Sequence, residues 1–205
     1  MVKAILWDND GILVETEHLY FEAGYKVLKD HGVEMDLNTY KRISLVEGGS
    51  VFQLIKDDID LDVLRAERDE IFRKMLIGMT PMPGVVKVLE YYHGKLPMAV
   101  ITSSKRVHFE TAHETTGLLP YFDFVLCAED YENSKPFPEP YLKGAAKYGF
   151  DPSECAVVED TERGVTAALA AGMQVYACPN ELSKTCDFTG VKKVLGSIEE
   201  LIEFL

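Results

Sequence analysis

Two aspartates spaced two residues apart follow a short apolar stretch near the start of the chain. The stretch 2–7 runs directly into Asp8-Asn9-Asp10-Gly11. Because residues two apart in an extended segment point the same way, Asp8 and Asp10 should present their carboxylates side by side. Such a pair repels itself unless a cation, or a reaction that uses both groups, offsets the repulsion. The alternative is a simple acidic turn, since Asp, Asn and Gly are common in turns.

Three further groups of polar residues follow or separate apolar stretches of the chain. Thr102 begins a Thr-Ser-Ser sequence after the stretch 98–101, Glu159-Asp160 follows 156–158, and Lys135 precedes Pro136 between them. Parallel strands place their carboxyl ends along one edge of a sheet, so these groups should meet the aspartate pair. Taken singly, each has a simpler explanation, such as a helix cap, a favourable charge at a helix N-terminus or a solvated lysine. Together they favour a reactive site.

Phosphoryl transfer is the chemistry that requires this set of side chains. Asp8, Asp160 and Glu159 offer the hard oxygen ligands that Mg²⁺ prefers. An aspartate with its ordinary pKa of about 3.9 is ionised at neutral pH, so it can attack phosphorus without a base. Mg²⁺ and Lys135 would offset the repulsion between that carboxylate and an anionic phosphate, while Thr102 and backbone amides would hold phosphate oxygens. The second aspartate would protonate the leaving alcohol and then activate water.

Five short apolar runs predict the strands that position these groups. Their hydrophobicity is continuous rather than alternating, which is typical of strands covered on both faces in a parallel sheet. Helical spacing lies between the runs: apolar residues recur at i, i+3, i+4 and i+7 over 85–92, and an alanine-rich segment covers 161–171. This alternation predicts a doubly wound α/β fold with a Rossmann-like parallel-sheet core. The predicted strands are Ala4–Trp7, Met98–Thr102, Phe124–Leu126, Ala156–Val158 and Val175–Ala177.

The region 15–80 interrupts this alternation, because it contains helical patterns and no convincing strand. One apolar stripe runs from Tyr20 to Leu28 and a second from Leu64 to Met75. We therefore predict a small helical cap at 15–80, inserted into a catalytic core made of 1–14 and 81–205. The insertion begins just after the aspartate pair, so the cap should cover that site like a lid.

Composition argues against several classes of partner. The 205 residues carry a formal net charge of −13, which disfavours nucleic acid and anionic membranes because both bind basic surfaces. The chain has no run of about 18 apolar residues, so no membrane span is predicted. The four cysteines form no Cys-x-x-Cys pair and are interpreted as reduced, mostly buried side chains, and the five scattered histidines as surface or hinge residues. We expect a cytoplasmic monomer that acts on a small phosphorylated substrate.

The same motifs resemble those of the haloacid dehalogenase superfamily, in the branch that contains β-phosphoglucomutase and sugar-phosphate phosphatases. The resemblance covers essentially the whole chain and includes the supporting runs PMPGVVKVLEYY and VVEDTERGVTAALAAGM. It implies a type 1 cap for the helical insertion and Mg²⁺ as the cofactor. The four motifs occur in the family's order: Asp8 to Val14, Thr102, Lys135-Pro136 and Glu159-Asp160.

The resemblance also implies a role for each motif residue. Asp8 is expected to be the nucleophile and Asp10 the acid/base catalyst, with Thr102 and Lys135 binding the phosphate. Closure of the cap would exclude water and contact the leaving group. The metal ligands that the resemblance implies are Asp8, the backbone carbonyl of Asp10, Glu159 and Asp160.

The chain departs from the family's pattern at several positions. Ile12 and Glu15 stand where the family often has Thr and Asp, and neither change removes a chemical role. Tyr20 stands where mutases carry a histidine, and the cap loop KRISLVEGGSVF lacks an obvious arginine for a second phosphate. Both departures weaken the mutase interpretation. The cations that could substitute for that arginine are Lys41, Arg42 and Lys56.

Several functions are compatible with parts of this pattern. We favour an Mg²⁺-dependent phosphatase of a small metabolite, above all a sugar phosphate, that acts through an aspartyl-phosphate. A hexose-phosphate mutase of the β-phosphoglucomutase type is the alternative. A dehalogenase would need neither Asp10 nor a metal. A signalling receiver is much shorter and phosphorylates an aspartate from a later strand, and a non-catalytic scaffold would not need every one of these chemical groups.

Overall fold

The strands of the computed structural model, which describes residues 1–56 and 59–205, form a parallel sheet in the order β3-β2-β1-β4-β5-β6. β1 is central and pairs with β2 on one side and β4 on the other. The predicted α/β class and all five predicted strands are confirmed, with ends that differ by at most one residue. The short sixth strand was not predicted, because both of its residues are exposed and form no apolar run. The strands are β1 (Ala4–Trp7), β2 (Met98–Ile101), β3 (Phe124–Leu126), β4 (Cys155–Glu159), β5 (Gln174–Ala177) and β6 (Lys193–Val194).

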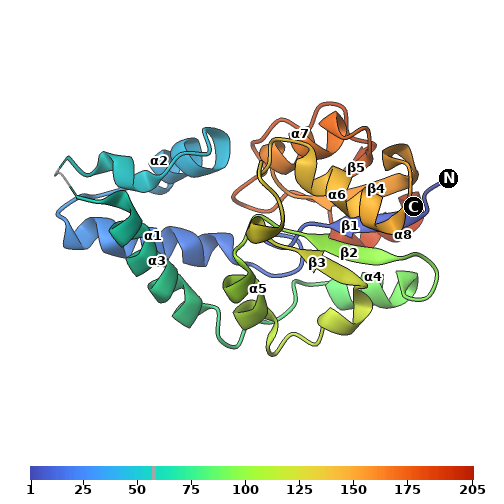
Figure 1. Cartoon of the computed structure of the whole chain (residues 1–205), viewed down its shortest axis with the longest axis horizontal. Coiled ribbons are helices and arrows are strands. Elements are labelled where there is room, and N and C mark those ends of the chain that lie inside the picture. The colour runs from blue at the N-terminus through green and yellow to red at the C-terminus, as the bar shows by residue number, and fades with distance from the viewer. Residues whose placement is uncertain (57–58) are drawn as a thin grey trace.

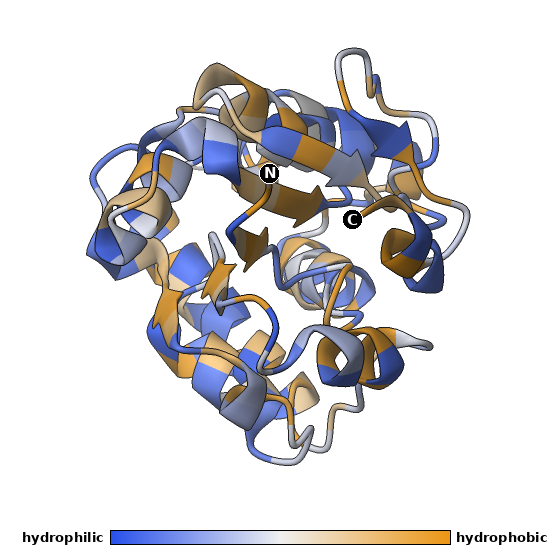
Figure 2. Cartoon of the chain, turned by 90° about the vertical axis from the view of Figure 1, so that its right-hand side faces the viewer, coloured by the Kyte–Doolittle hydropathy of each residue, from blue (hydrophilic) through white to orange (hydrophobic). Residues whose placement is uncertain are grey.

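Two hydrophobic clusters cover opposite faces of the sheet. Along β1, Ile5 and Trp7 point into one cluster and the residues that alternate with them point into the other. Figure 2 shows most strands near the centre in the hydrophobic colour and the surrounding helices in mixed colours. The first face packs against α4 (Val85–Tyr92), α5 (Arg106–His113) and α8 (Leu201–Phe204), and the second against α6 (Glu139–Tyr148) and α7 (Glu162–Ala170) (Figure 1).

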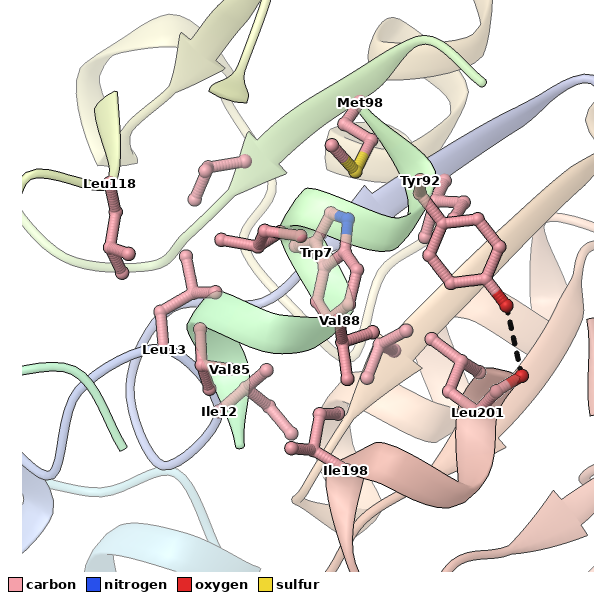
Figure 3. Packing of buried hydrophobic residues seen from close by; sticks show 14 of the residues in the cluster. Trp7, Ile12, Leu13, Val85, Val88, Tyr92, Met98, Leu118, Ile198 and Leu201 are labelled. Carbon is pink, nitrogen blue, oxygen red and sulfur yellow. Dashed lines mark hydrogen bonds between the residues drawn. The ribbon is translucent and has the colours of Figure 1, made fainter. Parts of the chain in front are cut away.

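The packing beneath β1 gives the strand a rigid base. Trp7 is fully buried between β1 and α4, among the side chains drawn in Figure 3. The hydroxyl of Tyr92 donates to the backbone carbonyl of Leu201 at 3.0 Å, which fastens the C-terminal helix to α4. Large buried aromatic side chains contribute much of the stability of such cores. The residue that follows Trp7, Asp8, is therefore held at the end of a well-packed strand.

A second lobe of helices lies beside the sheet lobe (Figure 1). It has its own hydrophobic cluster, which includes the fully buried Tyr40 and Leu64. The two chain segments that join the lobes are hydrogen-bonded to each other, because the Met82 amide donates to the Leu13 carbonyl at 2.9 Å. This lobe corresponds to the predicted cap, whose boundaries at 14/15 and 80/81 stay a prediction. Its elements are α1 (Glu17–Asp30), α2 (Leu37–Tyr40), a π-helical segment (Lys41–Val46), a 3₁₀ turn (Val51–Leu54) and α3 (Leu61–Met75).

Cysteines and histidines only partly follow the sequence-based expectations. All four cysteines are free thiols, but Cys127 and Cys155 are buried while the other two are half-buried. The interpretation of the histidines as surface or hinge residues is wrong for His108 and His113, which are buried. Among the described residues, no helix combines the length and apolar character that a membrane span requires. The cytoplasmic location and the monomeric state stay predictions.

Candidate active site

A cavity of about 540 Å³ lies between the carboxyl edge of the sheet and the cap. The aspartate pair lines it from the end of β1, where the Asp8 amide still donates to the Val158 carbonyl of β4 at 2.9 Å. Lys135 lines it from the loop before α6. The peptide bond between Lys135 and Pro136 in this loop is cis. The parallel topology therefore brings the sequence-predicted groups to one edge of the sheet, as expected.

Lys135 is the centre of a buried ion-pair network at this edge. Its Nζ donates to Asp8 Oδ1 at 2.6 Å, to Glu159 Oε1 at 2.7 Å and to the Ile101 carbonyl at 3.1 Å. Burial raises the pKa of Asp8 well above its usual range, Glu159 adds to this rise, and Lys135 opposes it. Burial alone would lower the pKa of Lys135, but Asp8 and Glu159 raise it above its usual range. The lysine is therefore a fixed positive charge beside the nucleophile candidate.

Glu159 orients this lysine, and both of its carboxylate oxygens accept hydrogen bonds from other groups. Its Oε1 also accepts a hydrogen bond from the Tyr141 hydroxyl at 2.9 Å. Its Oε2 accepts from the backbone amides of Asp160 and Thr161, at 3.0 and 3.1 Å, at the start of α7. The side chain lies so close to α7 that a Cβ on Gly164 would stand 1.7 Å from Oε1. Both carboxylate oxygens thus have protein partners.

The acidic residues at this edge fit a divalent cation. Asp8, Glu159 and Asp160 each place one carboxylate oxygen within 4.8 Å of the others, and all three residues are buried. In the described part of the chain, Asp160 Oδ1 is buried without a hydrogen-bond partner, while its Oδ2 accepts from the Asn180 amide at 2.9 Å. Lys135 is the only cation that forms an ion pair with any of the three carboxylates among these residues. Hard oxygen ligands with this charge are those that Mg²⁺ prefers.

Asp10 is surrounded by hydroxyl donors rather than by cations. Its Oδ2 accepts from the hydroxyls of Thr102 and Ser104, both at 2.9 Å, and its Oδ1 accepts from the Thr16 hydroxyl. Thr102, which we expected to bind phosphate, therefore contacts Asp10 through its hydroxyl, and it also accepts from the Ser104 amide at 3.0 Å. Neither Ser104 nor Thr16 was singled out from the sequence, where serine and threonine after a strand are too common to be informative.

A buried polar chain supports the loop between the two aspartates. Asn9 is 1% exposed, and its side-chain oxygen lies 2.7 Å from His113 Nε2, while His113 Nδ1 lies 2.8 Å from the Thr116 hydroxyl. Burial lowers the pKa of His113 to about 4, so its ring is neutral at pH 7. The Asn9 carbonyl also accepts amides from the next turn of the loop. Asn9 follows a buried strand and is polar, which could have indicated from the sequence that it needs a buried polar partner such as His113.

The cap wall of the cavity carries a different set of side chains. Tyr20 packs edge-on against Phe72 at 5.1 Å, and Arg68 lies over the Tyr20 ring at 4.4 Å. Asp69 on α3 pairs with Lys105 at the start of α5 at 2.5 Å, which bridges cap and core. The three cations named as possible substitutes for the missing arginine, Lys41, Arg42 and Lys56, are not among the residues that line the cavity. The cationic side chains that do line it, besides Lys135, are Arg65, Arg68, Lys105 and Arg163.

Comparison with known proteins assigns this fold and site to a family. The sequence model of the haloacid dehalogenase-like hydrolases matches residues 5–178, and the chain belongs to this family. It is 33% identical to the fructose-1-phosphate phosphatase YqaB of Escherichia coli strain K12, over 82% of this chain and 92% of that protein. It is 30% identical to a phosphorylated carbohydrates phosphatase of Thermotoga maritima, over 89% of this chain and 88% of that protein.

Solved structures confirm the fold. The structure of CbbY from Rhodobacter sphaeroides in complex with phosphate superposes with a TM-score of 0.85 at 21% identity, covering 98% of this chain and 96% of that one. A β-phosphoglucomutase from Clostridium difficile superposes with a TM-score of 0.82 at 20% identity, covering 100% and 95% of the two chains. The resemblance drawn from the sequence motifs is therefore confirmed at the level of family and fold.

Proposed function

We propose that the protein is an Mg²⁺-dependent phosphatase of a small phosphorylated carbohydrate, acting through an aspartyl-phosphate on Asp8. The observation that carries the proposal is the buried network at the sheet edge. It holds Asp8 between the fixed charge of Lys135 and the unpartnered oxygen of Asp160. The relatives named as phosphatases of fructose 1-phosphate and of phosphorylated carbohydrates support the class of substrate.

Mg²⁺ would be held by Asp8, Asp160, Glu159 and the backbone carbonyl of Asp10. The ion, when bound, supplies two positive charges that offset those of the buried carboxylates and of the phosphate. The unpartnered Asp160 Oδ1 is the oxygen best placed as a ligand, because no protein donor competes for it in the described part of the chain. Glu159, whose oxygens already accept several hydrogen bonds, would serve at least as much to hold Lys135.

The reaction follows from the positions of the two aspartates. In the first step an Asp8 carboxylate oxygen bonds to phosphorus while the bond from phosphorus to the ester oxygen breaks, and Asp10 gives a proton to that oxygen. In the second step Asp10 takes a proton from water, whose oxygen bonds to phosphorus and releases Asp8. Lys135 stabilises the negative charge on the phosphoryl oxygens in both steps. The hydroxyls of Thr102 and Ser104 orient Asp10 for both proton transfers.

Tyr20 supports hydrolysis over mutase chemistry. Burial raises the pKa of its hydroxyl to about 12, so it does not exchange protons near neutral pH. Its ring is fixed between Phe72 and Arg68. A mutase must return its phosphoryl group to the substrate, whereas a phosphatase releases inorganic phosphate. The position that carries a histidine in mutases therefore holds an inert aromatic side chain here.

Replacing the nucleophile tests the proposal directly. Asp8→Asn should lower Mg²⁺-dependent release of inorganic phosphate from a generic aryl phosphate by at least about 10⁴-fold, because the amide cannot form the phosphoenzyme. The circular dichroism spectrum should stay unchanged. Asp30→Asn, an exposed position at the end of α1, is the matched control and should keep full activity. Activity of Asp8→Asn within tenfold of the unaltered protein would refute the assignment.

A further inference from the structure

One acidic side chain in the cavity has no part in the phosphate chemistry. Glu17 is the first residue of α1 and lines the cavity with Asp8 and Asp10. In the described part of the chain, the other acids of the cavity wall have their partners: Asp8 and Glu159 pair with Lys135, Asp69 pairs with Arg68 and Lys105, and Asp10 accepts hydrogen bonds from three hydroxyls. No ion pair is formed by Glu17 among these residues.

The two oxygens of Glu17 have different surroundings. Oε1 accepts a hydrogen bond from the hydroxyl of Tyr40, which is 1% exposed and comes from the end of α2. Oε2 has no hydrogen-bond partner among the described residues, and it is not enclosed, because the side chain is half-buried and borders the cavity. One oxygen is therefore fixed by the cap, while the other is left to accept a hydrogen bond from a molecule in the cavity.

The position of Glu17 relates it to the leaving group rather than to the phosphate. It directly follows Thr16, whose hydroxyl donates to Asp10. Both Glu17 and Asp10 line the same cavity, and burial raises the pKa of Glu17 to about 7 against the opposing hydrogen bond of Tyr40, with a smaller rise from the charge of Asp10. Asp10 serves the ester oxygen of the leaving group. Glu17 therefore borders the part of the leaving group next to that oxygen.

The surrounding charges select the kind of donor that fits. A second phosphate beside Glu17 would meet a carboxylate, which disfavours it. Arg163 lines the same cavity and lowers the pKa of Glu17, so its charge already offsets part of that of the carboxylate and opposes a second cation there. A neutral hydroxyl is repelled neither by Glu17 nor by Arg163, and it can donate a hydrogen bond to the free carboxylate oxygen of Glu17.

From these contacts we propose that Glu17, held by Tyr40, is a specificity-determining residue that accepts a hydrogen bond from a hydroxyl of the leaving group close to the phosphoester. The substrate class is then a polyhydroxylated monophosphate, such as a sugar or sugar-alcohol phosphate. This inference rests on the proposed phosphatase function. Arg163 assists it by fixing the opposite wall, since its Nη2 donates to the Lys135 carbonyl at 2.5 Å and its Nη1 to the Ser44 carbonyl of the cap at 3.4 Å.

A matched pair of substrates tests this role. Sorbitol 6-phosphate and hexyl phosphate share a six-carbon chain and a primary phosphoester, but only the first has hydroxyls. At pH 8, above the pKa of Glu17, we expect Glu17→Gln to lower the ratio of their kcat/KM values roughly 10-fold, because a charge-assisted hydrogen bond becomes a weaker neutral one for one substrate alone. Tyr40→Phe, which frees the carboxylate to rotate, should lower the same ratio less. Glu22→Gln, an exposed change on the same helix, is the control and should leave the ratio unaltered.

The possible outcomes separate this inference from the function on which it rests. An unchanged ratio in Glu17→Gln, or an equal loss for both substrates, would overturn the specificity role and leave the phosphatase assignment intact. If the unaltered protein hydrolyses neither substrate with Mg²⁺, the proposed function fails and the inference fails with it. Binding of sorbitol 6-phosphate to Asp8→Asn, measured by calorimetry with and without Glu17→Gln, checks the same contact without turnover. A weaker binding in the double variant supports the role, and equal binding contradicts it.

Discussion

The sheet edge and the cap wall of the cavity are built in different ways. At the sheet edge, Asp8, Glu159 and Lys135 are almost fully buried; Lys135 and Glu159 each have several partners, and the Asp8 carboxylate accepts from Lys135. On the cap wall, Asp69 pairs with Lys105 of the core, which is more than half exposed, and one oxygen of Glu17 has no partner among the described residues. Preorganised charges favour a fixed chemical step, whereas open groups can adapt to different leaving groups. The contrast fits the two proposals, in which the sheet edge carries out the reaction and the cap wall selects the substrate.

Removing the central charge of the sheet edge should give the largest effect. Lys135→Met should lower kcat for an aryl phosphate by about 10²- to 10³-fold, because a charge that stabilises the phosphoryl oxygens is lost. It should also lower the free energy of unfolding by about 3 kcal/mol, since the buried carboxylates lose their counter-charge. Assays of phosphate release and urea unfolding measure the two effects.

Mg²⁺ provides a control for the origin of this loss. Because the ion would bind the folded state and offset the same carboxylates, adding it should restore part of the stability of Lys135→Met. Lys143→Met, at an exposed lysine paired with Glu139, should change stability by less than about 1 kcal/mol. Equal losses in the two variants would show that the buried network has no special role.

The support beneath the aspartate loop should make stability depend on pH. His113 has a pKa of about 4 in the folded protein and about 6.5 when unfolded. Between these values the unfolded chain binds more protons, so the free energy of unfolding should fall by about 2 kcal/mol from pH 7 to pH 5 through this group. His113→Gln should lack this part of the pH dependence. Urea unfolding of both proteins at several pH values measures the difference, and parallel curves would contradict the expectation.

The bridge between cap and core should give the smallest effect. Lys105→Ala removes the ion pair with Asp69, but Lys105 is 56% exposed and the pair is accessible to salt. The free energy of unfolding should fall by less than about 1 kcal/mol, and the difference should vanish in high salt because mobile ions screen exposed pairs. Thermal or urea unfolding at two salt concentrations tests this. A loss as large as that of Lys135→Met would remove the contrast between the two walls.

The same contrast explains how much could be predicted from the sequence. Asp8 and Asp160 were predicted because each follows an apolar run and parallel strands must end at one edge, and Lys135 because it precedes Pro136 between two of those runs. The sequence did not predict Glu17, Tyr40 or His113, the partner of Asn9. Their roles depend on how helices pack against the sheet, and local spacing does not encode that packing.

The cations of the cavity illustrate this limit. Lys41 and Arg42 belong to the cap loop, where a substrate-binding cation was expected, but Arg42 pairs with the neighbouring Glu47 and neither lines the cavity. Arg163 lies far from the cap in sequence, yet it reaches the cap at Ser44. Arg163 of α7 and Ser44 of the cap meet only because α7 packs against the π-helical segment of the cap.

The hydrogen bond between Met82 and Leu13 ties the two connecting segments at the base of the cap. This hydrogen bond would act as the hinge of the cap, so a rotation of the cap relative to the sheet would change the backbone of the residues just beyond Leu13. Thr16 is one of them, and its hydroxyl is one of three donors to Asp10. A rotation of the cap that carries Thr16 away would therefore remove one of these hydrogen bonds. Thr102 and Ser104 would then hold only Oδ2, so the orientation of the Asp10 carboxylate would depend on the position of the cap with no change in the sheet.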